Sequence, residues 1–353
     1  MKHSKAEVRG KARPALEVRF EAQNLTSYSG LILFQHFFSL IGIKQRLWGC
    51  FRHLKVNPIY SHHVILMLLI VHLIIGHRRL RDVDYYRDDE MVKRLLGLKR
   101  LPDVSTISRV LASADETSVE KLRSQSTGLV IERLSAERLA RVTLDFDGSV
   151  QSTGRHAEGT AVGFNKKKKG ARSYYPLFCT VAQTDQVLDV HHRPGNVHDS
   201  NGADAFIGHC LHSVRTALPR IKIETRIDSA FFNETIAERL DSMGVEFTIS
   251  VPFERFTELK GMIEGRKRWR RLNGELSFFE TRWKPKSWTT PHRFIFIRKQ
   301  VRRQDKAPVQ LDLFKPIEYG YEFKVIVSNK RGSPRRVVAF HEGRGSQEGI
   351  FAE

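Results

Sequence analysis

The 353-residue sequence is short of cysteine, of long hydrophobic runs and of acidic residues. Its three cysteines form no Cys-x-x-Cys motif and no Cys/His cluster, so we expect neither a disulfide nor a zinc site: they are Cys50, Cys179 and Cys210. The longest apolar run, residues 64–75, contains a histidine and is too short to span a membrane. No apolar segment follows the charged N-terminus before Leu31, so we expect no signal peptide.

The shortage of acidic residues gives the chain a strong positive charge. Its 59 lysines and arginines outnumber 39 aspartates and glutamates, for a formal net charge of +20. Such a charge favours a polyanionic partner, either a nucleic acid or an anionic membrane surface. Together with the missing membrane span, it predicts a cytoplasmic nucleic-acid-binding protein with no membrane partner. The length and the 41% hydrophobic content allow two or three domains with a large core.

Residues 1–140 predict an all-helical N-terminal domain for DNA binding or assembly. The first 24 residues are charged and without period, and helical patterns follow at 31–41, 62–76, 88–96, 101–111 and 117–134. The second helix is apolar nearly all round, which indicates a buried core helix.

The helix at 101–111 has two interpretations. Pro102 and Asp103 mark its start, and a short helix closed by Gly97 precedes it. The pair resembles a helix-turn-helix, in which Arg109 would contact DNA. A plain helical hairpin with a polar outer face explains the same residues, because so short a motif is weak evidence.

At residue 141 the pattern changes from helical to alternating. Strands are expected at 141–147, 173–183, 187–193, 221–228 and 245–251, with helices at 199–216 and 234–243. The order β-β-β-α-β-α-β is the ribonuclease H-like arrangement, an α/β fold with a central mixed sheet and helices on both faces. We therefore expect a ribonuclease H-like core at 141–251.

Residues 252–332 interrupt that order, and we interpret them as a basic β-rich insertion. Strand patterns occur at 275–283, 293–301 and 321–328, between segments rich in arginine and lysine. The charges indicate a nucleic-acid surface, with Arg268 and Arg270 on phosphates and Trp269 beside a base. The alternative is a set of solvated ribbon faces with tryptophans in a core. A second basic run ends a hairpin, where DNA contacts and a solvated loop are both open: it contains Lys167 and Lys168, with Arg172 nearby.

The segment 141–150 has two carboxylates on one face of a predicted strand. Val142, Leu144 and Phe146 alternate with polar residues, among them Asp145 and Asp147. Carboxylates are poor strand formers and repel each other on one face. Gly148 and Ser149 end the strand and place Asp147 at its tip. That position suits a metal-dependent site, and a solvated Asp-Gly turn explains it equally well.

Two further acidic residues extend this pattern into a candidate site. Asp228 ends the fourth strand, and Glu348 opens a late helix. Strands one and four are neighbours in a ribonuclease H-like sheet, so Asp147 and Asp228 would meet at one edge. Carboxylates that are so close repel unless a cation intervenes. Hard oxygen ligands suit two Mg²⁺ or Mn²⁺ ions about 4 Å apart, which activate an attacking oxygen and stabilise the leaving oxygen in phosphodiester transfer.

Five segments give the chain a family resemblance from about residue 20 to its end: 144–149, 163–177, 193–200, 226–229 and 341–348. In order and spacing they resemble bacterial insertion-sequence transposases with a DDE site. The chain most resembles the family numbered thirteen-eighty, a relative of family four. The resemblance implies DNA nicking and strand transfer at insertion-sequence ends with two Mg²⁺ or Mn²⁺ ions. It also implies double-stranded DNA as partner at the transposon ends and the target, a homodimer on DNA, and a bacterial, nucleoid-associated location.

The resemblance also implies roles for individual residues. The two aspartates are Asp147 and Asp228, with Asp145 as the competing choice for the first, and the glutamate is Glu348. Arg344 matches the arginine of a Tyr-x2-Arg-x3-Glu-x6-Lys signature and would contact a DNA phosphate. His341 stands where that signature has tyrosine, and a histidine can still donate to a phosphate.

The lysine of that signature would fall at position 355, beyond the last residue. We therefore expect residues 333–353 to be only the start of the glutamate-bearing helix, in a C-terminally truncated copy. The alternative function is an inactive truncated transposase that acts only as a DNA-binding protein or inhibitor.

Overall fold

The computed structural model describes residues 26–55, 59–153, 157–163, 165, 168–197, 201–300 and 320–345. The chain divides into two compact units, Met1–Leu122 and Arg123–Glu353. The division lies within helix α7 (Glu116–Ala136), whereas the sequence patterns placed it near residue 140. The C-terminal part of α7 belongs to the second unit because Thr127 donates a hydrogen bond to the carbonyl of Leu188 (3.0 Å). No described helix is both long and apolar enough to cross a membrane.

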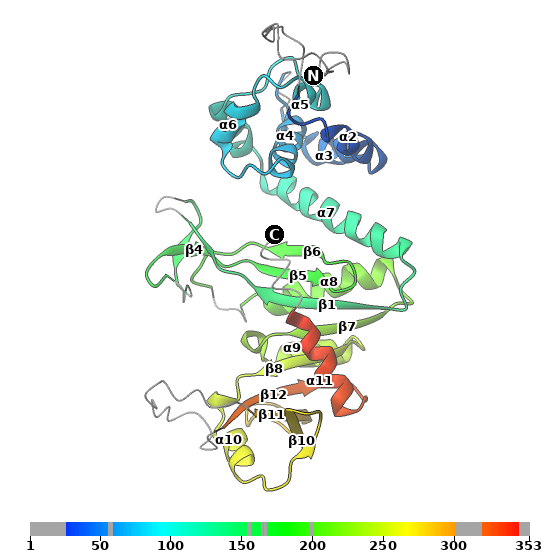
Figure 1. The fold of residues 1–353 in the computed structure, drawn as a ribbon, viewed down its shortest axis with the longest axis vertical. Coiled ribbons are helices and arrows are strands. Elements are labelled where there is room, and N and C mark those ends of the chain that lie inside the picture. The colour runs from blue at the N-terminus through cyan, green and yellow to red at the C-terminus, as the bar shows by residue number, and fades with distance from the viewer. Residues whose placement is uncertain are drawn as a thin grey trace, which may run out of the picture. The chain divides into compact units, whose positions relative to one another are not determined.

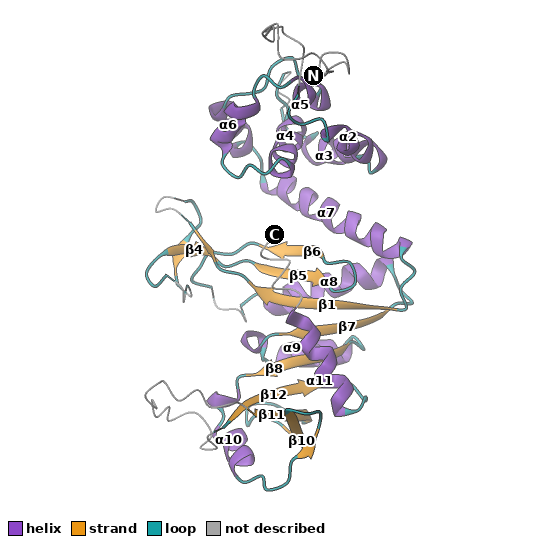
Figure 2. Cartoon of the chain, in the orientation of Figure 1, coloured by secondary structure: helices purple, strands orange, loops and turns teal. Residues whose placement is uncertain are grey.

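The described residues of the first unit form helices (Figures 1 and 2). The elements are α2 (Leu31–Leu40), α3 (Ile43–Phe51), α4 (His62–Ile74), the 3₁₀ helix η1 (Leu80–Tyr86), α5 (Glu90–Leu96) and α6 (Val104–Ala112). The apolar helix α4 lies in the core, where Ile65, Leu68 and Val71 are fully buried. Asp89 caps α5 and Asp103 caps α6, because each carboxylate accepts hydrogen bonds from backbone N–H groups of the first turn of its helix.

A nine-stranded mixed sheet organises the second unit. Its strands are β1 (Arg141–Gly148), β5 (Leu177–Val181), β6 (Gln186–His191), β7 (Lys222–Ile227), β8 (Glu246–Val251), β9 (Arg270–Arg271), β10 (Leu276–Trp283), β11 (His292–Gln300) and β12 (Tyr321–Ser328). The order across the sheet is β6-β5-β1-β7-β8-β12-β11-β10-β9. The pairs β1–β7 and β7–β8 are parallel and the others antiparallel. The first and fourth predicted strands, β1 and β7, are therefore neighbours, as expected.

The predicted strand 173–183 is divided in the structure. Pro176 cannot donate a ladder hydrogen bond, and the chain forms β4 (Arg172–Tyr174) before it and β5 after it. β4 pairs with β2 (Gln151–Ser152) and β3 (Ala161–Val162) in a separate three-stranded sheet.

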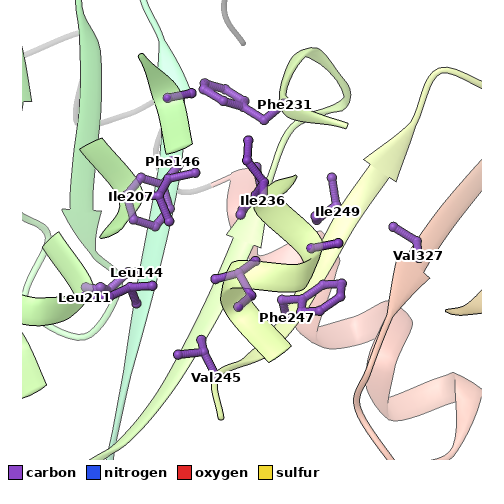
Figure 3. Close-up of a cluster of buried hydrophobic side chains, with 14 of the residues drawn as sticks. Leu144, Phe146, Ile207, Leu211, Phe231, Ile236, Val245, Phe247, Ile249 and Val327 are labelled. Atoms are coloured by element: carbon purple, nitrogen blue, oxygen red, sulfur yellow. The ribbon is translucent and has the colours of Figure 1, made fainter. Parts of the chain in front are cut away.

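Each face of the large sheet carries its own hydrophobic core. Helices α8 (Ala203–Ala217) and α9 (Glu234–Ser242) cover one face, where Phe146 packs edge-on against Phe206 with ring centroids 6.1 Å apart. Figure 3 shows Ile207 of α8 and Ile236 of α9 among the buried side chains of this core. Helix α11 (Pro334–Glu342) packs on the other face, where Val337 and Val338 join a second cluster. Strand β11 contributes to both cores, because Phe294 and Phe296 alternate with isoleucines that belong to the second cluster.

The strands of the region 252–332 extend the main sheet. β12 pairs with β8 in register Val325↔Val251, and β11, β10 and β9 follow outward. The sequence predicts a basic β-rich insertion here, and in the structure its strands cover the edge of the sheet that β8 leaves open. Helix α10 (Thr257–Glu264) and the 3₁₀ helix η3 (Phe253–Arg255) were not predicted.

Candidate active site

The register of two parallel strands brings Asp147 and Asp228 to one edge of the sheet. β1 pairs with β7 at Asp145↔Arg226 and finally at Phe146↔Ile227. Asp147 of β1 and Asp228, the first residue after β7, directly follow this last pair and so lie at the same edge. Arg226 faces α11, since it donates to the carbonyl of Phe340, and its register partner Asp145 shares that face. Asp147 and Asp228 lie two residues further along, so their carboxyl groups belong to the same face of the sheet.

Arg344 joins the two aspartates. It lies in the 3₁₀ turn η4 (Gly343–Gly345) directly after α11. Its Nη1 lies 3.3 Å from Oδ2 of Asp147, and its Nη2 lies 3.4 Å from Oδ1 of Asp228. Contacts of one guanidinium with both carboxylates show that the two aspartates are close together and that their surroundings suit positive charge. The side chains are partly exposed, with 22% of Asp147 and 34% of Asp228 accessible.

Asp145, the competing choice for the first aspartate, already has a buried partner. Its carboxylate accepts two bonds from Arg226, 2.6 Å from Nε and 2.5 Å from Nη2, and only 1% of its side chain is exposed. Burial raises the pKa of Asp145, and the Arg226 guanidinium opposes that shift. Arg226 also donates to the carbonyl of Phe340 in α11 (3.3 Å). These contacts give Asp145 a structural position beneath the site.

His341 fixes α11 to the sheet. Its Nδ1 lies 2.9 Å from Oγ1 of Thr248, and its Nε2 lies 2.8 Å from Oγ of Ser250. Burial lowers the pKa of His341 well below the ordinary histidine value, so the ring is neutral at neutral pH. We expected His341 to donate to a DNA phosphate. With 1% of the residue exposed and both ring nitrogens bound to strand β8, it holds the helix instead.

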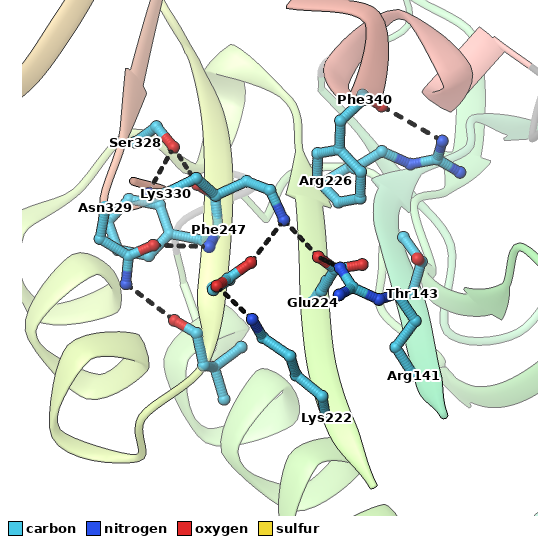
Figure 4. Close-up of polar contacts among 12 residues, drawn as sticks. Arg141, Thr143, Lys222, Glu224, Arg226, Phe247, Ser328, Asn329, Lys330 and Phe340 are labelled. Atoms are coloured by element: carbon cyan, nitrogen blue, oxygen red, sulfur yellow. Dashed lines mark hydrogen bonds and ion pairs between the residues drawn. The ribbon is translucent and has the colours of Figure 1, made fainter. Parts of the chain in front are cut away.

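The same face of the sheet continues away from the aspartates as a row of paired charges (Figure 4). Arg141 donates to Glu224 (2.5 Å), and Lys330 contacts both Glu224 and Glu246. Lys330 also lies 4.0 Å from the ring centre of Phe340 in α11. Glu224 and Arg226 of β7 are two residues apart on this face, and each is paired with a residue of opposite charge. Asp228 is the next position of the same row, so the row of paired charges ends at the site.

Residues 8–353 match the family described as transposase DDE domain, group 1. The chain belongs to this transposase family. No curated protein matches it.

Two solved structures show distant similarity to this transposase domain. The piggyBac transposase synaptic complex with hairpin DNA is 10% identical with a TM-score of 0.45, covering 91% of this chain and 67% of that chain. The Mos1 transposase paired-end complex with the left transposon end is 8% identical with a TM-score of 0.22, covering 55% of this chain and 60% of that chain.

The third predicted acidic residue of the transposase site, Glu348, lies outside the described residues. Within the described ranges, no group of three or more His, Cys, Asp or Glu side chains could hold a metal ion. Asp147 and Asp228 fit a divalent cation by their chemistry, because they are oxygen ligands that already share the positive charge of Arg344.

The predicted DNA contacts fall into exposed and packed positions. Arg109, Lys168, Arg172, Arg268 and Arg270 are exposed, and Lys167 lies outside the described residues.

Trp269 is packed instead of being available to a base. It meets Phe279 edge-on at 4.8 Å between centroids, and the guanidinium of Arg298 covers its ring at 4.6 Å. Its Nε1 donates to the carbonyl of Arg266 (3.1 Å). The core interpretation therefore fits Trp269 better than the base contact we expected.

Sequence reasoning missed Lys324 of β12. It is exposed and shares its face of the sheet with Ile326, which packs with α11. Its ammonium interacts electrostatically with Glu342, Arg344 and Asp228. The available signal was its position, two residues before Ile326 in an alternating strand.

Proposed function

We propose that this protein is an insertion-sequence transposase that nicks DNA at the ends of a mobile element and joins them to a target. Its assignment to the bacterial family numbered thirteen-eighty and its ribonuclease H-like core are parts of the same proposal. The observation that carries it is the meeting of Asp147 and Asp228 at Arg344, within a chain of the transposase DDE family. The strand order around β1 supports the core assignment.

Asp147 and Asp228 would hold two Mg²⁺ or Mn²⁺ ions, with Glu348 as the proposed third ligand. When bound, such ions activate a water or 3′-hydroxyl and stabilise the leaving oxygen in phosphodiester transfer. The protein's own contribution is position: the strand register fixes the two aspartates, and His341 fixes the helix that precedes Arg344.

Arg344 would leave its carboxylate contacts in part to bind a phosphate near the cut, since a guanidinium forms strong paired bonds with phosphate oxygens. Lys324 would add a second cation on the same face. Arg109, Lys168, Arg172, Arg268 and Arg270 are exposed cations for the backbone of double-stranded DNA. Two copies would act together, because joining a mobile element to a target requires both of its ends.

The test is metal-dependent nicking of a supercoiled plasmid that carries the element's ends. We expect nicking with Mg²⁺ or Mn²⁺, its loss in Asp228→Asn, and its retention in Asp185→Asn. Asp185 is a matched control because it is an exposed turn residue with φ 53°, a conformation that asparagine tolerates.

Other outcomes separate the alternatives. Binding of the ends without nicking would support the DNA-binding protein or inhibitor. Cleavage that ignores the ends would support a nuclease unconnected with transposition.

A further inference from the structure

Helix α2 has two apolar stripes, and only one of them is buried. Leu31 and Phe38 pack into the core of the first unit, with 3% and 8% of each residue exposed. Leu33, Phe37 and Leu40 lie on the opposite side of the helix and are 74%, 52% and 73% exposed. A surface helix ordinarily presents polar residues there. The second stripe therefore calls for an explanation other than the stability of its own unit.

The spacing of the exposed stripe is that of a helix–helix contact. Leu33, Phe37 and Leu40 stand at i, i+4 and i+7, so their side chains form one row along the helix. Ile32 and Phe34 flank the row and are 59% and 37% exposed. Taking about 200 Å² for each large side chain, the five expose on the order of 600 Å². A standard interface buries about 800 Å² per partner, so the row together with its two flanking residues would form most of one side.

We propose that this row, defined as Leu33, Phe37 and Leu40, binds the same row of a second copy of this chain, α2 against α2. A twofold interface must be complementary to itself, and this row is, because α2 contains no Asp, Glu, Lys or Arg. The rest of the chain carries a net charge of +20, which repels a second copy. An uncharged apolar row is the kind of surface on which two such copies can associate.

DNA does not fit this row. Phosphates require cations or hydrogen-bond donors, and the row offers neither. An acidic partner protein would likewise need basic residues on α2. The inference rests on the proposed function for its use of two copies, and its test requires neither DNA nor metal.

The test is analytical ultracentrifugation of the full chain at about 0.15 M and 0.5 M NaCl. We expect a dimer that persists or strengthens at the higher salt, because salt screens the repulsion between copies and does not weaken apolar contacts. Leu33→Asp and Phe37→Asp should each shift the chain to monomer, with a dissociation constant at least 10-fold higher. Leu73→Asp is the matched control, since Leu73 is 64% exposed on α4 and lies outside the row.

Cross-linking locates the contact directly. His36 is exposed on the side of the row, and the three native cysteines are buried. His36→Cys should form a disulfide-linked dimer under mild oxidation, and Ser108→Cys, on exposed α6, should not.

A chain that is monomeric at both salt concentrations would overturn the inference, as would a dimer unchanged in Leu33→Asp. A monomeric wild type in which Leu33→Asp instead lowers the unfolding midpoint would show that the chain covers the row itself. A monomer would leave the plasmid-nicking result standing, and a dimer without nicking would leave the interface standing, so the two failures are distinguishable.

Discussion

The ion pair between Asp145 and Arg226 gives the sharpest test of which aspartate is structural. Asp145→Asn removes the negative charge and leaves the Arg226 guanidinium, 8% exposed, without its bidentate partner. Breaking a buried pair from one side costs about 3–5 kcal/mol, because an uncompensated charge stays in a medium that solvates it poorly. We therefore expect the free energy of unfolding of the second unit to fall by about that amount. The urea midpoint would fall by roughly 1–2 M.

Tryptophan fluorescence during urea unfolding measures this loss selectively. Trp269, Trp283 and Trp288 pack with the core of the second unit, and Trp48 is the single tryptophan of the first. The double change Asp145→Leu with Arg226→Met should recover most of the stability, since replacing both partners by apolar side chains of similar size is often neutral.

Nicking by these variants and by Asp147→Asn decides which aspartate serves the chemistry. Asp147→Asn should keep the free energy of unfolding within about 1 kcal/mol of the wild-type value and abolish nicking, because Asp147 and its partner Arg344 are both partly exposed. The double variant should fold and retain nicking. If Asp145→Asn kept the wild-type midpoint and lost nicking, Asp145 would be the metal ligand and the assignment of Asp147 would be wrong.

Three further predictions concern the end of α11. A Cβ at Gly343 would lie 2.2 Å from Nη1 of Arg226, so Gly343→Ala should displace the turn that carries Arg344 and reduce nicking. Gly332→Ala is the control and should leave nicking unchanged, because the nearest atom to its Cβ would be 3.8 Å away. Arg344→Gln should lower the nicking rate by about 10- to 100-fold, the effect of one lost charged hydrogen bond, with unfolding measured to confirm a folded variant. Burial holds the pKa of His341 in the folded chain well below 6.5, so as the pH falls below about 6.5 only the unfolded chain takes up a proton at this residue. The contribution of His341 to the free energy of unfolding is therefore full above that pH and is lost below it, by up to about 1.4 kcal/mol per pH unit. Urea unfolding at pH 7.5 and 5.5 should show a smaller difference in His341→Gln than in wild type, and equal differences would contradict the buried neutral ring.

The sequence by itself determined the two strands that end at the aspartates and the edge of the sheet at which the aspartates lie. Alternation at 141–147 and 221–228 marked two strands, each with an aspartate at its C-terminal end. The ribonuclease H-like order made those two strands neighbours, as β1 and β7 are in the structure. This succeeded because hydrophobic periodicity is local: it records which side of a strand or helix is buried, whatever the partner. The apolar run at 62–76 marked the central helix α4 for the same reason.

Tertiary structure alone decided the partners. Arg344 contacts a residue 197 positions away, and Arg226 pairs with Asp145 across 81 positions. A histidine at position 341 could bind a phosphate at the surface, but the ring of His341 is buried because helix α11 places it against the two hydroxyl groups of Thr248 and Ser250 in β8. Trp269 likewise has basic neighbours in the sequence, but its ring packs against Phe279 and Arg298 in the folded chain. Residue type and spacing specify what a side chain can bind, whereas register and helix packing between distant segments decide what it meets.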